Sequence, residues 1–164
     1  MTAAVLSIGS NLGDRMAHLR SAASCVADSL VAASAVYETD PWGPVEQPAY
    51  LNAVLLVDDP GADSRGWLAR AHALEAAAGR VRAERWGPRT LDVDLITVEG
   101  VTSDDPELTL PHPRAHERAF VLVPWLDADP EAVLPGHGPV RSLLSGLDAA
   151  VVRPFAPAAE LVPR

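Results

Sequence analysis

The sequence predicts an α+β fold with a ferredoxin-like βαββαβ core, in which helices flank an antiparallel sheet. Three observations lead to this prediction. Short apolar stretches are bounded by Gly and Pro, two longer stretches repeat apolar residues at helical spacing, and together they follow one another as strand, helix, strand, strand, helix, strand. This order is the split βαβ pattern of an α+β sandwich, with helices covering one face of the sheet.

The first elements are a strand and a helix. Residues 3–8 form a short apolar run, which predicts a buried strand, and the loop 9–13 ends it with two glycines. A helix is expected from about residue 14 to 30, because apolar residues recur at helical spacing at Leu19, Ala23, Val26 and Leu30. The single cysteine, Cys25, is expected on the buried side of this helix instead of in a reactive position.

The middle of the chain supplies two strands and a second helix. Residues 31–37 predict a strand, the Pro-rich segment 40–49 a loop, and residues 50–57 another strand. The next helix is expected from about residue 64 to 78, with Gly79 as its stop signal.

The last strand of the core follows an arginine-rich loop and is expected over residues 90–98. Shorter helical pieces are predicted at 116–126 and 140–147. With 164 residues and 48% hydrophobic content, the chain is expected to form one domain over residues 1–160. Residues 161–164 resemble the remnant of a cleavable tag and are left out of the fold prediction; a natural tail is the alternative.

Composition limits the classes of partner. The formal net charge is -9, which argues against general binding to nucleic acid or to anionic membranes. The beginning of the sequence lacks a basic start and a long apolar stretch, and one cysteine cannot form an internal disulfide. We therefore expect a cytoplasmic protein. A monomer is a separate expectation.

Cations are concentrated immediately before a pair of acids. Arg80, Arg82, Arg85 and Arg89 fall within ten residues of a chain that contains no lysine. Guanidinium groups bind phosphate oxygens through two-point contacts and stay charged at any working pH. The loop is therefore a candidate site for a small polyphosphate, although basic residues that only keep a loop soluble are the alternative.

Asp92 and Asp94 alternate with aliphatic residues in the expected strand 90–98. A period of two places both carboxylates on one face, with Cα atoms roughly 6.5 Å apart. Carboxylates this close persist most readily when cations neutralise them, and magnesium commonly joins one or two carboxylates to substrate phosphates. A solvated strand edge is the alternative for an isolated Asp-x-Asp pair.

Taken together, these residues resemble the 6-hydroxymethyl-7,8-dihydropterin pyrophosphokinase family. The resemblance covers about three quarters of the chain, and the string from Arg85 to Asp94 is its most specific part. It runs in order through the segments 7–15, 37–39, 47–52, 85–94 and 110–120. It implies transfer of a pyrophosphoryl group from ATP to the pterin hydroxymethyl group with release of AMP, and it implies two magnesium ions.

The resemblance also implies roles for individual residues. Asp92 and Asp94 correspond to the magnesium ligands and, with Arg80 and Arg82 of the mobile loop, to the catalytic group. The ATP-binding residues would be Glu75, Trp86, Arg89, His112 and Arg118. The pterin-binding residues would be Thr39, Asp40, Trp42, Tyr50, Asn52 and Phe120.

Some of these residues have simpler explanations. Trp86, Tyr50 and Phe120 could be packing residues, and His112 could belong to a Pro-flanked turn. Asn52 is harder to explain in this way, because an amide in an apolar strand needs hydrogen-bond partners.

Three positions depart from the family pattern. Glu107 stands where some members carry an arginine, Pro113 where some carry an aromatic residue, and His72 where some carry a glutamine; His72 is assigned no role.

Two other classes of function stay open at this point. A nucleotidyltransferase would release pyrophosphate instead of AMP, and a ligand-sensing module would bind a nucleotide without magnesium-dependent turnover.

Overall fold

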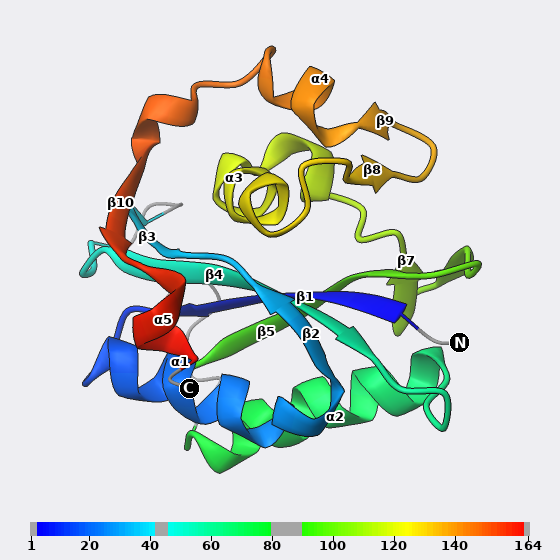
Figure 1. Ribbon diagram of the computed structural model, residues 1–164, viewed down its shortest axis with the longest axis horizontal. Helices are drawn as coiled ribbons and strands as arrows, with labels where there is room; N and C mark the ends of the chain where they lie inside the picture. The colour runs from blue at the N-terminus through cyan, green and yellow to red at the C-terminus, as the bar shows by residue number, and fades with distance from the viewer. Residues whose placement is uncertain (1–2, 42–45, 80–89, 163–164) are drawn as a thin grey trace.

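The computed structural model describes residues 3–41, 46–79 and 90–162, and its centre is an antiparallel sheet. The sheet order is β10–β3–β4–β1–β5, with β2 also paired to β4. Figure 1 shows the sheet edge-on between two layers of helices. The strands of this sheet are β1 (Ala3–Ser10), β2 (Leu30–Ala33), β3 (Val36–Thr39), β4 (Tyr50–Asp58), β5 (Asp92–Val98) and β10 (Val152–Ala156).

The predicted ferredoxin-like order is confirmed. β1 lies between β4 and β5 and pairs antiparallel with both, so the strands that flank it come from distant parts of the sequence. The helix α1 (Arg15–Cys25) lies between β1 and β2 in the chain, and α2 (Ser64–Ala77) lies between β4 and β5. Asp14 and Asp63 cap these helices, because their carboxylates accept hydrogen bonds from the backbone N–H groups of Ala17 and Gly66.

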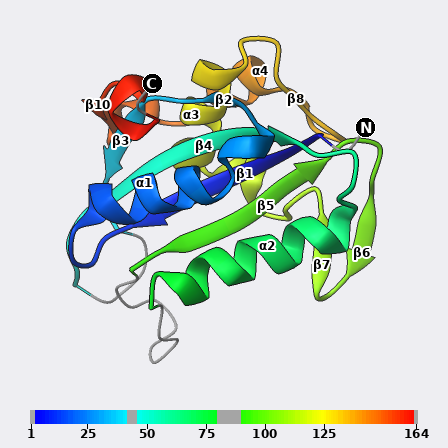
Figure 2. The same ribbon diagram turned by 60° about the horizontal axis from the view of Figure 1, so that its bottom comes forward.

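The main core lies between the sheet and the two helices α1 and α2. Both helices cover the same face, as Figure 2 shows from below. Their buried side chains include Leu19, Ala23, Trp67, Ala71 and Leu74, which pack with the inward residues of β1, β4 and β5. The helical spacing predicted from the sequence therefore marks the buried sides of both helices.

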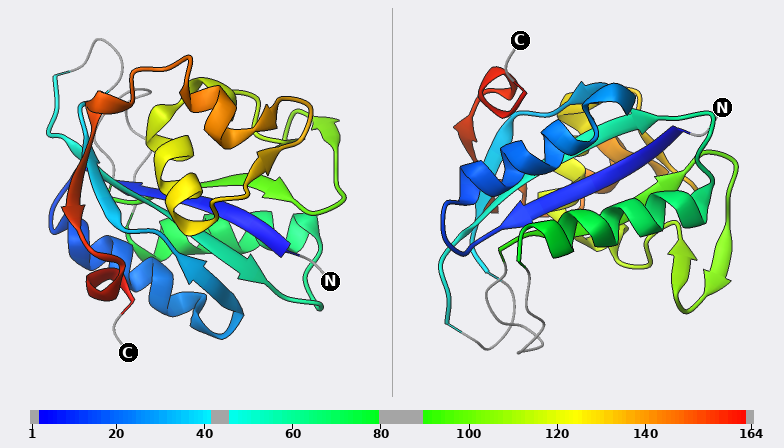
Figure 3. Two further views of the ribbon diagram at one scale, coloured as in Figure 1. Left: turned by 45° about the horizontal axis from the view of Figure 1, so that its top comes forward. Right: turned by 90° about the horizontal axis from the view of Figure 1, so that it is seen from below.

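The prediction that helices cover one face was incomplete, because the tail supplies a second layer. Helices α3 (Ala119–Ala128) and α4 (Val140–Leu144) lie on the opposite face of the sheet, as the two views in Figure 3 show. Val121, Leu122 and Trp125 of α3 pack against Val54 and Ile96 in a second core. The same strands therefore present buried apolar residues on both faces.

The remaining elements are short. They are the 3-10 turns η1 (Ala27–Ser29), η2 (Ala115–Glu117) and η3 (Ala149–Val151), the hairpin β6 (Ser103–Asp105) with β7 (Leu108–Leu110), the hairpin β8 (Val133–Leu134) with β9 (Gly138–Pro139), and α5 (Ala158–Leu161). In the described residues, no helix is long and apolar enough to span a membrane.

Several expected boundaries were wrong. The first helix ends at Cys25 instead of residue 30, and Leu30 begins β2, although its side chain still packs against the main core. The strand expected over 31–37 is two strands separated at Ser34 and Ala35. Ser34 N–H still donates to the Val54 carbonyl at 2.9 Å, whereas Ser34 Oγ accepts from the Val54 N–H, so a side chain replaces one of the two backbone bonds at this break.

One expectation about burial was also wrong. Cys25 is exposed, because it lies away from the helix face that carries Leu19, Ala22 and Val26. Leu161, which the sequence analysis left out of the fold, is 1% exposed and packs into the main core. The contact is reinforced by Arg20 of α1, whose Nε donates a hydrogen bond to the Glu160 carbonyl at 2.7 Å.

Candidate active site

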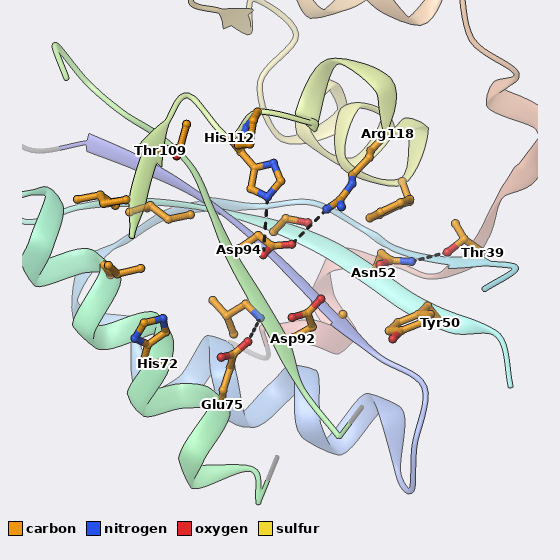
Figure 4. Close-up of a pocket in the computed structure, with 18 of the residues that line it drawn as sticks. Thr39, Tyr50, Asn52, His72, Glu75, Asp92, Asp94, Thr109, His112 and Arg118 are labelled. Atoms are coloured by element: carbon orange, nitrogen blue, oxygen red, sulfur yellow. Dashed lines mark hydrogen bonds and ion pairs between the residues drawn. The ribbon is translucent and has the colours of Figure 1, made fainter. Parts of the chain in front are cut away.

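A pocket of about 540 Å³ opens on the α3 face of the sheet, at the end that α3 leaves uncovered. Figure 4 shows strand residues from the sheet forming its floor, with His112 and Arg118 above them and α2 at its side. Every predicted site residue within the described ranges lines this pocket: Thr39, Asp40, Tyr50, Asn52, Glu75, Asp92, Asp94, His112, Arg118 and Phe120. The predicted residues Trp42, Arg80, Arg82, Trp86 and Arg89 lie outside the described residues.

Asp92 and Asp94 form the acidic end of the pocket. They lie on β5 two residues apart and face the pocket together, while Val93 and Leu95 between and after them point into the main core. The Asp94 carboxylate has Arg118 Nη1 at 3.6 Å from one oxygen and His112 Nε2 at 4.0 Å from the other. The pair therefore offers hard oxygen donors beside a fixed positive charge.

His112 is held as a neutral imidazole. Burial lowers its pKa to about 4, the Arg118 guanidinium acts in the same direction, and the Asp92 carboxylate partly offsets both. Its Nδ1 accepts a hydrogen bond from the Arg114 N–H at 3.2 Å, which leaves the proton on Nε2. At neutral pH the contact with Asp94 is thus not an ion pair, and Nε2 presents a hydrogen-bond donor to the pocket.

Glu75 holds the strand between the two aspartates. Its side chain comes from α2 and is 5% exposed, and its Oε2 accepts a hydrogen bond from the Val93 backbone N–H at 3.0 Å. In the described part of the chain β5 lies at the edge of the sheet, so no strand there pairs with this N–H on that side. Glu75 therefore fixes the segment that presents both carboxylates, a geometry that its position in the sequence did not reveal.

Across β1 from the two carboxylates, the pocket carries a neutral amide. Asn52 is 4% exposed on β4, and its Nδ2 donates a hydrogen bond of 2.7 Å to Thr39 Oγ1 on β3. This contact orients the carboxamide. Tyr50 and Phe120 also line the pocket, and the Arg118 guanidinium lies 5.5 Å from the centre of the Phe120 ring. Aromatic walls with a few oriented polar groups are typical of small-molecule sites.

The loop before Tyr50 is held by residues that were not among the predicted site residues. Asn11 Nδ2 donates hydrogen bonds to Gln47 Oε1 at 2.7 Å and to the Pro48 carbonyl at 3.0 Å. Arg15 Nη1 donates to the Ala49 carbonyl at 3.0 Å. An asparagine in the loop after a buried strand was the available signal, since a buried amide requires partners.

Other lining residues were also missed or left without a role. The β1 residues Ser7 and Gly9 form part of the floor, and the strand extends to Ser10 instead of ending at residue 8. A group from α2 and the β6–β7 region completes one wall. It consists of Leu68, His72, Pro106, Glu107, Leu108, Thr109 and Pro113. In the described part of the chain, no group of three or more His, Cys, Asp and Glu side chains forms a ready-made metal site.

The fold and the pocket define an α+β sandwich that can bind a small molecule between an amide at one end and paired carboxylates at the other. Residues 5–130 match the family described as 7,8-dihydro-6-hydroxymethylpterin-pyrophosphokinase. The chain belongs to this family.

Relatives support the assignment over nearly the full length. A protein of Mycobacterium tuberculosis (strain ATCC 25618 / H37Rv) is 54% identical, covering 98% of this chain and 94% of the relative, and is named 2-amino-4-hydroxy-6-hydroxymethyldihydropteridine pyrophosphokinase. A protein of the same name from Methylorubrum extorquens is 43% identical and covers 90% of this chain and 95% of the relative.

Solved structures agree on the fold. The structure described as Plasmodium falciparum HPPK-DHPS wild type superimposes with a TM-score of 0.65 at 13% identity. The match covers 88% of this chain and 44% of that chain, so this chain spans less than half the length of the solved protein. At this identity the likeness concerns the fold alone.

Proposed function

We propose that the protein transfers a pyrophosphoryl group from ATP to the hydroxymethyl group of 6-hydroxymethyl-7,8-dihydropterin, giving AMP and the pterin diphosphate for folate biosynthesis. Membership of the family supports this reaction. The structural observation that carries the proposal is the placement of Asn52 and the pair Asp92 and Asp94 on either side of Gly9 in one pocket. The side of the amide suits a neutral heterocycle, and the side of the carboxylates suits phosphates with metal ions.

At the acidic end, Asp92 and Asp94 would hold two Mg²⁺ ions. Their shared face and carboxylate oxygens fit this metal, which is commonly bound by one or two carboxylates together with substrate phosphates. Bound there, the ions would neutralise charge on the triphosphate. Arg118 would add a fixed positive charge beside Asp94, and neutral His112 would donate a hydrogen bond from Nε2 to a phosphate oxygen.

At the neutral end, Asn52 would read the amide-like edge of the pterin. The hydrogen bond to Thr39 holds the carboxamide in place, and Tyr50 and Phe120 would contact the ring faces. Asp40 lies at the rim, where its carboxylate accepts a hydrogen bond from Arg153 at 3.2 Å.

The chemistry would depend mainly on positioning and charge. The pterin hydroxyl oxygen forms a bond to the β-phosphorus, the bond from that phosphorus to the α,β-bridging oxygen breaks, and AMP leaves. We assign no general base for the hydroxyl proton. The roles of Arg80, Arg82, Trp86 and Arg89 in closing over and binding ATP, and of Trp42 beside the pterin, stay predictions from the sequence. The same holds for the monomeric state and the cytoplasmic location.

The test is to incubate the protein with ATP, Mg²⁺ and the reduced hydroxymethylpterin and to identify the products. We expect AMP and the pterin diphosphate, with turnover that disappears when EDTA removes the metal. Release of pyrophosphate with a nucleotidylated pterin would indicate a nucleotidyltransferase instead. Nucleotide binding without any turnover would indicate a ligand-sensing module.

A further inference from the structure

Gly9 occupies the middle of the pocket floor. It lies on the central strand β1, where it pairs with Asn52 of β4 on one side and with Asp92 of β5 on the other. Paired residues of adjacent strands face the same side of a sheet, and all three line the pocket. Gly9 therefore separates the amide end from the acidic end.

Backbone conformation does not explain this glycine. The described glycines with positive φ are found elsewhere in the chain, at Gly13, Gly79, Gly100, Gly136 and Gly138. Glycine inside a strand weakens it, and it often marks a place where a ligand or another group approaches the backbone closely. The explanation for Gly9 must therefore lie in the space above it.

A side chain at this position would enter the pocket. A Cβ atom on Gly9 would lie 3.0 Å from Asn52 Oδ1 and 3.4 Å from Tyr50 Cδ1. The first distance is tighter than ordinary van der Waals contact, so the carboxamide would have to shift slightly, and the methyl group would also occupy the floor between the two ends.

The sheet geometry indicates which part of the substrate needs this space. Neighbouring strands lie about 4.8 Å apart, so the backbones at Asn52 and Asp92 are separated by roughly 10 Å across Gly9. If Asn52 reads the pterin ring and Asp92 belongs to the phosphate end, as the proposed function holds, the group that joins them must cross Gly9. That group is the hydroxymethyl substituent.

We propose that Gly9 is a specificity-determining residue: its missing side chain leaves the space in which the carbon and hydroxyl oxygen of the C6 substituent lie against the strand. This inference rests on the proposed function and adds the position of the reacting hydroxyl group. It assigns Gly9 a contact with the substituent, distinct from the contact of Asn52 with the ring.

The test compares two ligands in the Gly9→Ala variant. Binding of 6-hydroxymethyl-7,8-dihydropterin and of 7,8-dihydropterin, which has no C6 substituent, is measured by calorimetry with Mg²⁺ and α,β-methylene-ATP present. We expect the variant to bind the substituted pterin at least 10-fold more weakly and the unsubstituted one no more than 3-fold more weakly. Equal losses would mean that the methyl group acts only by displacing Asn52, and would overturn the inference.

Gly146→Ala is the matched control, because Gly146 is exposed and its added Cβ would meet its nearest atom, the Leu143 carbonyl oxygen, only at 3.7 Å. It should bind both pterins as the wild type does. A wild-type protein that binds neither pterin would overturn the proposed function and this inference with it, whereas equal losses in Gly9→Ala overturn the inference alone.

A measurement on the wild-type protein covers the case in which Gly9→Ala does not fold. In the ternary complex, the Gly9 α-protons should show intermolecular nuclear Overhauser effects to the methylene protons of the C6 substituent. Effects from the pterin to Tyr50 without any to Gly9 would place the substituent elsewhere and contradict the proposal.

Discussion

One face of the sheet has two ends with opposite character. Under α3, the strands β1, β4 and β5 present Val5, Val54 and Ile96, which are buried in the second core. Further along the same face, the same strands present Gly9, Asn52 and Asp92 to the pocket. The difference shows that a single surface can supply stability where a helix covers it and a binding site where the helix stops.

The acidic residue nearest to Arg118 should give the largest effect. Asp94→Ala removes a proposed magnesium ligand, and because such a metal contributes several kcal/mol of transition-state stabilisation, turnover should fall about 10³-fold or more. Its side chain lies in the open pocket, so the free energy of unfolding should change by less than about 1 kcal/mol. AMP release and urea denaturation measure the two quantities, and retained turnover would contradict the metal role.

At the end of the sheet that α3 covers, a substitution should change stability instead of activity. Leu122→Ala creates a cavity at a residue of α3 that is 0% exposed, so it should lower the free energy of unfolding by about 2–5 kcal/mol. Below its melting temperature the variant should keep the wild-type KM for both substrates. A large change in KM with unchanged stability would show that the two ends are not separate in function.

Within the pocket, Asn52→Ala should separate the two substrates. Losing the hydrogen bonds of the carboxamide should weaken pterin binding by about 1–3 kcal/mol, while the affinity for α,β-methylene-ATP should stay within 2-fold. Thr39→Val, which removes the hydroxyl that holds Asn52, should give a smaller loss for the same ligand. Equal losses for pterin and nucleotide in Asn52→Ala would argue against a pterin contact.

The smallest effect concerns the pH dependence of stability. The pKa of His112 is about 4 in the folded protein and about 6.5 in an unfolded chain, so between these values the unfolded state binds more protons. The free energy of unfolding is therefore highest above pH 6.5 and decreases as the pH falls toward 4. Between pH 7.5 and 5.5 the decrease due to His112 should be about 1 kcal/mol.

His112→Gln tests this contribution, because glutamine keeps a hydrogen-bond donor but does not titrate. Urea denaturation in EDTA at both pH values should show a smaller acid-induced loss in the variant than in the wild type. Identical losses would mean that the burial of His112 does not govern this part of the pH dependence.

Much of the fold could be predicted because local patterns agree with it. The order of strands and helices follows from the spacing of apolar residues and from the Gly and Pro residues that bound each stretch. The alternation around Asp92 and Asp94 places both carboxylates on one face. The break between β2 and β3 could not be predicted in this way. It depends on Ser34 bonding to β4 and on Asp127 of α3 accepting a hydrogen bond from the Ala35 N–H at 2.8 Å. Such partners are far apart in the sequence.

The site was predicted mainly through its residue types and the family resemblance. The positions of Glu75 and Gly9 required the structure, since the role of each depends on register. Glu75 reaches the one backbone N–H between the two aspartates, and Gly9 pairs with residues more than 40 and 80 positions away. Spacing along the chain contains no information about either relation.

The central place of β1 constrains how the chain reaches its native state. During synthesis β1 emerges before its partners β4 and β5, which end only at Asp58 and Val98. Its apolar residues can therefore be covered only after much later segments of the chain have been made. Such non-local strand pairing is slow, and intermediates with exposed apolar surface are prone to aggregate. The strand that carries Gly9 therefore stays without both of its sheet neighbours until β5 has been made.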